Sequence, residues 1–299
     1  TDLNIMNITI GIPAFNEENT IADIVKRSLK FSDKVLVCDD GSKDSTSKNA
    51  ENSGALVIRH KKNSGKGAAL QSLFEYVKKL DFDVVVTIDG DGQFLPEEIE
   101  KLSEPVLKKE FDIVIGNRFS NSDEMPRYRK AGNKIFDKVT KLASDLPVED
   151  SQSGFRAYSS EAINKISIHS SGFGIDSEIL IDAVQKNLKI TEKPVTVLYD
   201  TGFKTSTKNP ISHSTGVMAS LLQLIAINHP LRFLGIPGFI LFIIGIIFSI
   251  IVMTMFNESR FFSIPSTLVA IGSLVTGLML ILMSVVLYSI SQIVKKIGN

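Results

Sequence analysis

The chain has 299 residues, with 33 basic and 33 acidic side chains, so its formal net charge of zero gives no electrostatic case for nucleic-acid binding. Its single cysteine, Cys38, cannot form a disulfide within the chain, which fits a reducing compartment. The charged part, residues 1–232, is long enough for one good-sized core, so we expect one catalytic domain.

Short apolar runs alternate with helical patterns over the first 120 residues. The runs expected to be buried strands are 8–12, 34–38, 56–59, 84–88 and 113–115. The segments with helical spacing are 20–29, 45–53, 67–80 and 96–108, the last beginning at Pro96 with two glutamates behind it. This alternation predicts an α/β fold with a mainly parallel sheet and helices on both faces, in which ligands bind beyond the carboxyl ends of the strands.

The pattern is less regular after residue 120. We expect a longer helix at 128–146, a loop at 150–156 and helices near Ser160 and Asp176. Residues 214–228 carry apolar side chains at helical spacing, which predicts an amphipathic helix on the bilayer surface. The expected organisation is a catalytic domain at 1–209, a juxtamembrane helix at 210–230 and a membrane segment at 231–299.

Two uncharged stretches, 233–256 and 261–294, are each long enough to cross a bilayer as a helix. The apolar run 8–12 is too short for a signal peptide, so insertion is expected to depend on this C-terminal pair. Lys295 and Lys296 follow the second stretch, whereas the loop between the two carries one acid and one base. By the positive-inside tendency, the C-terminus and the catalytic domain are then cytosolic.

The strongest chemical signal follows the fourth expected strand, where Asp89 and Asp91 stand two residues apart with glycines between and after them. In extended chain this spacing puts both carboxylates on one side. Mg²⁺ or Mn²⁺ is commonly held by one or two carboxylates, with substrate phosphates completing the shell. By itself the segment is equally consistent with a turn rich in aspartate and glycine.

Two other strands end in polar groups, PAFNEE at 13–18 and DDGS at 39–42. Together with NSGKG at 63–67, DGDGQ at 89–93, GNRF at 116–119 and SQSGFR at 151–156, they form an ordered set that resembles family 2 glycosyltransferases of the GT-A fold. Within that family the chain is similar to the dolichyl- or polyprenyl-phosphate sugar synthases. The resemblance covers residues 8–208, and paired C-terminal membrane helices also occur among these enzymes.

The resemblance implies an inverting transfer of a hexose from a nucleotide-sugar to dolichyl or polyprenyl phosphate, with Mg²⁺ or Mn²⁺ as cofactor. The side chains it assigns to the donor are Pro13, Ala14, Asn16, Glu17, Asp40, Asn63, Gly65, Lys66, Gly67, Asp89 and Gln93. Those assigned to the metal are Asp89, Asp91 and Gln93.

The acceptor side is also implied by the resemblance. Its lipid-phosphate group is Arg118, Arg129, Asn133, Lys204 and Lys208, and its catalytic group is Asp91, Arg118 and Asp150. Because a lipid phosphate is already ionised, we expect Asp150 to orient the sugar or a cation rather than act as a base. Many mannosyl synthases carry an arginine before a Ser-Lys pair near the membrane. This chain has only Lys204 and Lys208 there, so GDP-mannose, UDP-glucose and UDP-N-acetylglucosamine all stay open as donors.

The motifs of two other enzyme classes are absent from the sequence. The segment NSGKG lacks the upstream glycine and following Ser or Thr of a phosphate-binding loop, and no G-x-G-x-x-G follows the first strand, which argues against an NTPase and a dinucleotide enzyme. A glycosyltransferase acting on a glycolipid or polysaccharide hydroxyl stays open, as does a non-catalytic scaffold that binds lipid phosphate. The histidines His60, His169, His213 and His229 have no metal-ligand spacing.

Overall fold

The structure is a computed structural model of the full chain, and it describes residues 7–119, 148–168, 175–198 and 230–297. The chain divides into two compact units, Thr1–Leu221 and Leu222–Asn299, which are taken separately below. The expected helices at 128–146 and 214–228 lie outside the described residues.

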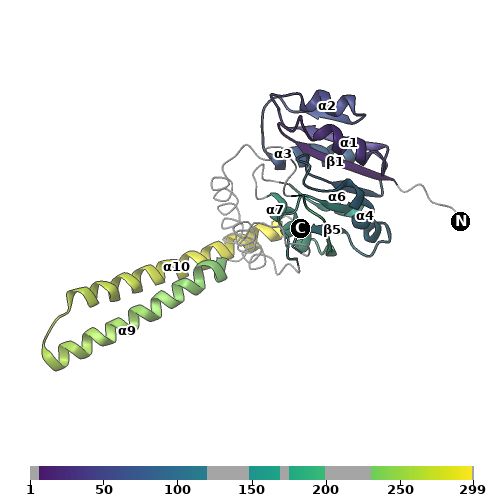
Figure 1. The fold of residues 1–299 in the computed structure, drawn as a ribbon. Coiled ribbons are helices and arrows are strands. Elements are labelled where there is room, and N and C mark those ends of the chain that lie inside the picture. The colour runs from purple at the N-terminus through teal and green to yellow at the C-terminus, as the bar shows by residue number, and fades with distance from the viewer. Residues whose placement is uncertain (1–6, 120–147, 169–174, 199–229, 298–299) are drawn as a thin grey trace. The chain divides into compact units, whose positions relative to one another are not determined.

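A seven-stranded sheet in the order β3-β2-β1-β4-β6-β5-β7 forms the first unit (Figure 1). Its strands are β1 (Ile8–Ala14), β2 (Lys34–Asp39), β3 (Leu56–Arg59), β4 (Val84–Thr87), β5 (Ile113–Asn117), β6 (Arg156–Ser159) and β7 (Ile190–Pro194). Strand β6 pairs antiparallel with both β4 and β5, and the other neighbours pair parallel. The mainly parallel α/β sheet expected from the sequence is therefore confirmed.

Helices cover both faces of this sheet, as the alternation of side chains along β1 requires. Ile10 and Ile12 are fully buried in a cluster with residues of α1 (Ile21–Ser28) and α4 (Ile99–Leu107). Gly11, between them, faces the opposite way and approaches Leu73 of α3 (Lys66–Val77). Successive strand residues point to opposite faces, so one strand supplies both layers of the core.

The remaining helices of this unit are α2 (Thr46–Asn52), a short 3-10 turn at Pro96–Glu98, α6 (Ser160–Lys165) and α7 (Ile175–Gln185). The helices expected near residues 160 and 176 are therefore present. Strands β1, β2 and β5 run one or two residues beyond their expected ends, and β4 ends one residue earlier. Arg156 was expected in a loop but begins β6, because this short segment finds ladder partners on β4 along one edge and on β5 along the other.

The second unit is a helical hairpin. A π-helical turn, Leu231–Gly235, leads into α9 (Ile236–Ser259), and α10 (Ile264–Ile297) returns antiparallel beside it (Figure 1). The segments Leu231–Ser259 and Ile264–Ile293 are long and apolar enough to cross a membrane. Gly238 and Gly277 stand at the helix contact, where an added Cβ would meet the backbone of the opposite helix at 3.0 and 2.6 Å, so small residues permit the close approach.

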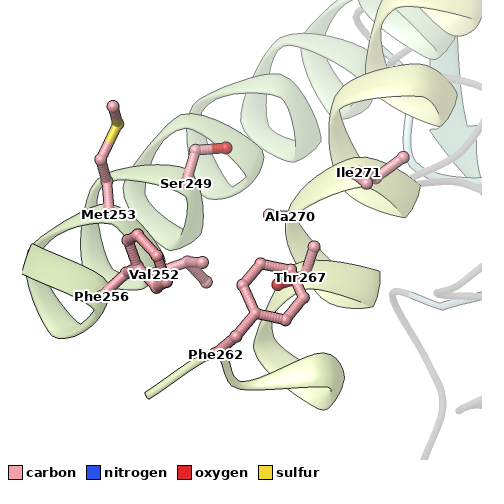
Figure 2. Close-up of a pocket in the computed structure, with 8 residues that line it drawn as sticks. All are labelled: Ser249, Val252, Met253, Phe256, Phe262, Thr267, Ala270 and Ile271. Atoms are coloured by element: carbon pink, nitrogen blue, oxygen red, sulfur yellow. The ribbon is translucent and has the colours of Figure 1, made fainter. Parts of the chain in front are cut away.

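The hairpin opens towards its turn. A cavity of about 340 Å³ lies between the helices, lined by Ser249, Val252, Met253, Phe256, Phe262, Thr267, Ala270 and Ile271 (Figure 2). Arg260 ends α9 in the left-handed conformation and lies over the ring of Phe256, 5.6 Å from its centroid.

Candidate active site

Four loops of the first unit meet at the carboxyl edge of the sheet. Three follow the parallel neighbours β1, β2 and β4, and the fourth, residues 150–155, enters β6. Because β6 is antiparallel to β4, its first residue, Arg156, pairs with Thr87 at the end of β4. The start of an antiparallel strand therefore reaches the same edge as the ends of the parallel ones.

The loops after β1 and β2 are clasped together by short hydrogen bonds. The amide of Asn16, which has a positive φ of 57°, donates to Ser42 Oγ at 2.8 Å. The amide of Glu17 donates to Thr46 Oγ1 at 2.8 Å, and Lys43 N donates to Asn16 Oδ1 at 3.0 Å. Pro13 and Ala14 are the last two residues of β1. The loop that carries the donor residues assigned by resemblance is thus held by hydrogen bonds to residues 42–46.

Asp40 is 3% exposed and organises the loop that precedes α3. Its carboxylate accepts hydrogen bonds from Ser64 N at 2.9 Å and Gly65 N at 2.7 Å. His60 Nδ1 lies 2.7 Å from the same carboxylate. Gly41 has a φ of +74°, and a Cβ there would meet the backbone of Lys62 at 2.5 Å. The DDGS and NSGKG segments are therefore in direct contact, and the donor role assigned to Asp40 stays a prediction.

The loop after β4 carries the two aspartates of the predicted metal pair. Asp91 Oδ1 accepts from Gln93 N at 3.0 Å, and the buried hydroxyl of Thr20 donates to Gly90 O at 2.6 Å. Gln93 O accepts from Leu198 N at 2.9 Å, so the loop is anchored on both sides. This anchoring fixes the backbone from which both carboxylates project.

Gly154, in the SQSGFR segment, makes room for Asp89. A Cβ built on Gly154 would clash with all three carboxylate atoms of Asp89. The neighbouring backbone is held in place, because Thr87 Oγ1 donates to Gly154 O at 3.0 Å. Glycine is needed at position 154 because a side chain there would collide with Asp89, and the reason is steric rather than conformational.

Lys66, at the start of α3, bridges two acids. Its Nζ lies 3.0 Å from Asp89 Oδ1 and 3.1 Å from Asp176 Oδ2. Burial by itself would lower the pKa of this ammonium, but Asp176 and Asp89 outweigh it and hold the pKa above its ordinary value. Asp176, in the first turn of α7, was expected only as part of a helix, and nothing in its local sequence signals that α7 brings it to Lys66.

Two acids at this edge have raised pKa values. Burial, with Asp91 and Asp89 adding like charge, raises the pKa of Glu17 to about 8. Burial, followed by the charge of Asp89, raises the pKa of Asp91 to about 6. Such shifts arise because these carboxyl groups are both buried and close to like charge, a combination that is common at functional sites.

Arg118 and Asp150 form a two-pronged ion pair beside this cluster. Arg118 Nε and Nη2 each donate to a different oxygen of Asp150 at 2.7 Å, and Arg118 N donates to Oδ2 at 3.0 Å. Asp150 is fully buried, whereas the Arg118 side chain is 19% exposed. Glu192 accepts from the amide of Asp150 at 2.7 Å, which fixes the loop that carries it. Both carboxylate oxygens of Asp150 are thus engaged.

Arg156 is fully buried at the start of β6 rather than in a loop. Its guanidinium donates to three carbonyl oxygens, those of Ser153 at 2.8 Å, Ser151 at 2.8 Å and Asp176 at 2.9 Å. The nearby side chain of Gln152 donates to Ser177 Oγ. The arginine of SQSGFR therefore shapes the loop and the start of α7 from within.

The structure brings together, at one edge, most of the residues expected to form the site. Among the described residues these are Pro13, Ala14, Asn16, Glu17, Asp40, Lys66, Asp89, Asp91, Gln93, Arg118 and Asp150. Arg129, Asn133, Lys204 and Lys208 lie outside the described residues, as do His169, His213 and His229. The individual roles of all these side chains stay predictions.

Comparison with known proteins gives the family. The model of glycosyl transferase family 2 matches residues 9–167. A UDP-N-acetylglucosamine–dolichyl-phosphate N-acetylglucosaminyltransferase of Methanococcus voltae is 32% identical over 215 residues, which are 64% of this chain and 86% of that protein. A dolichol-phosphate mannosyltransferase of Pyrococcus furiosus is 32% identical over 208 residues, 64% of this chain and 56% of that protein.

Among solved structures, glucosyl-3-phosphoglycerate synthase of Mycobacterium tuberculosis, with Mn²⁺ and UDP-glucose, superposes with a TM-score of 0.59. It is 24% identical and covers 74% of this chain and 80% of its own, a likeness that concerns the fold. The non-catalytic scaffold kept open from the sequence is set aside by these relatives, which are named as transferases. The chain belongs to glycosyltransferase family 2, is an enzyme that transfers a sugar, and resembles the dolichyl-phosphate sugar synthases within that family.

Proposed function

We propose that this glycosyltransferase moves a hexose from a nucleotide-sugar to dolichyl or polyprenyl phosphate, with inversion at the anomeric carbon. The product is a lipid-phosphate-linked sugar for glycan assembly. The donor is GDP-mannose, UDP-glucose or UDP-N-acetylglucosamine. The relatives named above support the class of donor and acceptor.

The carboxylates of Asp89 and Asp91 fit a divalent cation. Among the described residues, no three His, Cys, Asp or Glu side chains converge as a metal site of their own. Two carboxylates with the donor diphosphate, however, make the open oxygen shell that Mg²⁺ prefers. When bound, Mg²⁺ or Mn²⁺ would neutralise charge on the leaving diphosphate as a Lewis acid. Burial, with the like charge of Asp89 adding to it, raises the pKa of Asp91, and a divalent cation beside the pair would favour the ionised form.

Lys66 is suited to hold the donor diphosphate. Its ammonium already lies between Asp89 and Asp176, at the end of a helix-start loop whose glycines let a ligand approach the backbone. A cation placed here counters the charge that develops on the leaving group. Gly154 supports the arrangement by leaving space for Asp89.

The observation that most favours a phosphate acceptor is the state of Asp150. Both of its oxygens accept from Arg118, so it does not offer a free base to deprotonate a hydroxyl acceptor. A lipid phosphate, with a second pKa of about 6, is largely ionised at neutral pH and needs positioning rather than deprotonation. The part-exposed guanidinium of Arg118, held in place by Asp150, offers positive charge to such a phosphate.

The transfer itself needs one bond made and one broken. An acceptor phosphate oxygen attacks the anomeric carbon, and the bond from that carbon to the nucleoside diphosphate oxygen breaks as the electron pair leaves with the diphosphate. Attack from the face opposite the leaving group inverts the configuration. The role of the described side chains is to orient both phosphates and to balance their charge.

The hairpin α9–α10 accounts for the membrane-borne acceptor. Two crossings would return the chain to the side on which it began, and Lys295 and Lys296 favour a cytosolic C-terminus. On this proposal the catalytic domain is on the cytosolic face. Arg129, Asn133, Lys204 and Lys208 are proposed to contact the lipid phosphate.

The test is a transfer assay with the full chain in proteoliposomes. Radiolabelled GDP-mannose, UDP-glucose and UDP-N-acetylglucosamine are each incubated with dolichyl or undecaprenyl phosphate, with Mn²⁺ or with EDTA. We expect label in the organic phase with one donor, dependent on both Mn²⁺ and the lipid phosphate. Transfer only to a glycolipid hydroxyl would favour the alternative acceptor, and no label with any donor would contradict the proposal.

A further inference from the structure

His60 links three segments that are distant in the sequence. It follows β3, and its Nδ1 lies 2.7 Å from Asp40 Oδ1 in the loop after β2. Its Nε2 lies 2.9 Å from the hydroxyl of Ser72, on α3, and 3.6 Å from the thiol of Cys38, on β2. The side chains of His60 and Asp40 are 17% and 4% exposed, so their contact is largely shielded from water. The imidazole thus ties the sheet edge to the helix that carries Lys66.

The partners of the ring determine its tautomer. The carboxylate of Asp40 only accepts hydrogen bonds, and it already does so from two backbone amides. Nδ1 must therefore carry a proton and donate to Asp40. In the neutral ring Nε2 is then the acceptor, and the Ser72 hydroxyl is the donor that faces it.

The contact with Asp40 reaches the donor side through a short turn. Asp40 accepts from Ser64 N and Gly65 N, and Gly65 adopts a φ of +95° directly before Lys66. Lys66 in turn places its ammonium 3.0 Å from Asp89. The path Ser72–His60–Asp40–Gly65–Lys66 is continuous, and each of its links is a hydrogen bond or a peptide bond.

We propose that His60 is a positioning residue of the nucleotide-sugar site, which sets the conformation of the 63–66 turn through Asp40 and so places Lys66. The inference rests on the proposed function, since it assigns Lys66 to the donor diphosphate. His60 acts through Asp40 and makes no contact with substrate in this role. Its loss should therefore weaken the binding of the donor more than it slows the transfer of donor already bound.

Substitutions can test the contacts of Nδ1 and of Nε2 separately. His60→Leu keeps most of the volume and removes the contacts of both nitrogens. His60→Asn keeps an N–H close to the position of Nδ1 and loses the contact with Ser72. Ser72→Ala removes the outer hydroxyl alone. Lys61→Ala, at the adjacent position, is the matched control, because no part of the path passes through its side chain.

The experiment measures binding of UDP and GDP to the full chain in detergent with Mn²⁺ by calorimetry, and KM and kcat for the donor where transfer is observed. We expect His60→Leu to raise the nucleotide Kd and the donor KM about tenfold, the factor set by one hydrogen bond to a charged group, with kcat changed less than threefold. His60→Asn should recover most of the affinity, Ser72→Ala should lose about threefold, and Lys61→Ala should match the wild type.

The outcomes separate the inference from the function on which it rests. Wild-type binding that is unchanged in His60→Leu would overturn the role of His60 and leave the proposed function intact. Equal losses in His60→Leu and His60→Asn would also overturn it, because the N–H to Asp40 would then not matter. Failure of the wild-type chain to bind either nucleotide would overturn both. If His60→Leu does not fold, the other two variants still test the path. A loss of nucleotide affinity in Ser72→Ala without a fall in kcat fits the path, and an unchanged affinity in Ser72→Ala contradicts it.

Discussion

Two loops at the same edge of the sheet carry paired acids, and their surroundings are opposite. The carboxylates of Asp39 and Asp40, after β2, are buried and hydrogen-bonded, Asp39 to Ser42 N and Ser47 Oγ and Asp40 to two amides and His60. Around the loop after β4, burial and like charge together raise the pKa of Asp91 and that of the neighbouring Glu17, although Lys66 pairs with Asp89. Buried carboxylates with a full set of hydrogen-bond donors stabilise a fold, whereas buried acids with perturbed pKa values are common at functional sites.

The largest effect should come from neutralising the acidic loop after β4. Asp91→Asn keeps the shape and the acceptor for Gln93 N but removes a charge needed to hold a divalent cation, so transfer should fall at least about a hundredfold. The melting temperature in EDTA should stay the same or rise, because a like-charge repulsion is lost. Asp150→Asn should reduce transfer less, and equal losses in the two variants would argue against an orienting role for Asp150.

A steric test of the same loop is Gly154→Ala. The new Cβ would clash with the Asp89 carboxylate and displace it, so we expect transfer to fall about tenfold or more, as for other small misplacements in active sites. Activity is measured in proteoliposomes at saturating Mn²⁺. Gly272→Ala is the control, because a Cβ there meets nothing within 4 Å. Equal activity in the two variants would mean that the position of Asp89 is not critical.

A substitution in the loop after β2 should lower the stability of the fold. Asp40→Asn leaves one oxygen to serve the amides of Ser64 and Gly65 and turns an NH₂ group towards a donor, at about 1–3 kcal/mol for each buried donor left unpaired. We expect a melting temperature lowered by about 5 °C, measured by thermal unfolding in detergent. A melting temperature that falls more in Asp91→Asn than in Asp40→Asn would reverse the comparison.

The acidic cluster also predicts a pH dependence in the cation-free protein. The pKa of Glu17 rises from 4.5 to about 8 on folding and that of Asp91 from 3.8 to about 6, so the folded state keeps protons that the unfolded state releases. The stability contributed by these groups is fully present below their unfolded pKa values of 4.5 and 3.8, and it is lost as the pH rises through the folded values towards 8. The melting temperature in EDTA should fall over this range, with a shallower slope in Glu17→Gln. A rising melting temperature would contradict the assignment.

The smallest effect concerns Cys38, in β2 directly before the Asp39–Asp40 loop. Burial, with Asp40 and Asp39 adding negative charge, raises the pKa of its thiol to about 12. We expect less than about a tenth of the protein to react with a maleimide at pH 8 in the folded state, and full reaction after denaturation, because the thiolate is the nucleophile. Rapid labelling of the folded chain would show that this part of the sheet opens.

Much of the fold followed from local pattern. The alternation of apolar runs with helical spacing predicted β1 to β5 and their helices, and the expected burial is found in β1, β2, β4 and β5. Strand β3 is at the sheet edge and is half exposed, contrary to the expectation that it is buried. The two uncharged C-terminal stretches predicted α9 and α10 by length alone. The motifs also indicated which strand ends carry the chemistry, because carboxyl ends of parallel strands meet at one edge.

Other features depended on contacts between distant segments. Strand β6 is four residues long and exists because β4 and β5 both offer it hydrogen-bonding partners, a condition that its own sequence does not record. The same holds for Asp176, which only the packing of α7 brings to Lys66, and for Arg156, whose three carbonyl partners come from one loop and the first turn of α7. Sequence by itself determined periodicity, length and chemical type; tertiary structure decided which charges are paired and which lie beside like charge, because pairing depends on distances that only the folded chain sets.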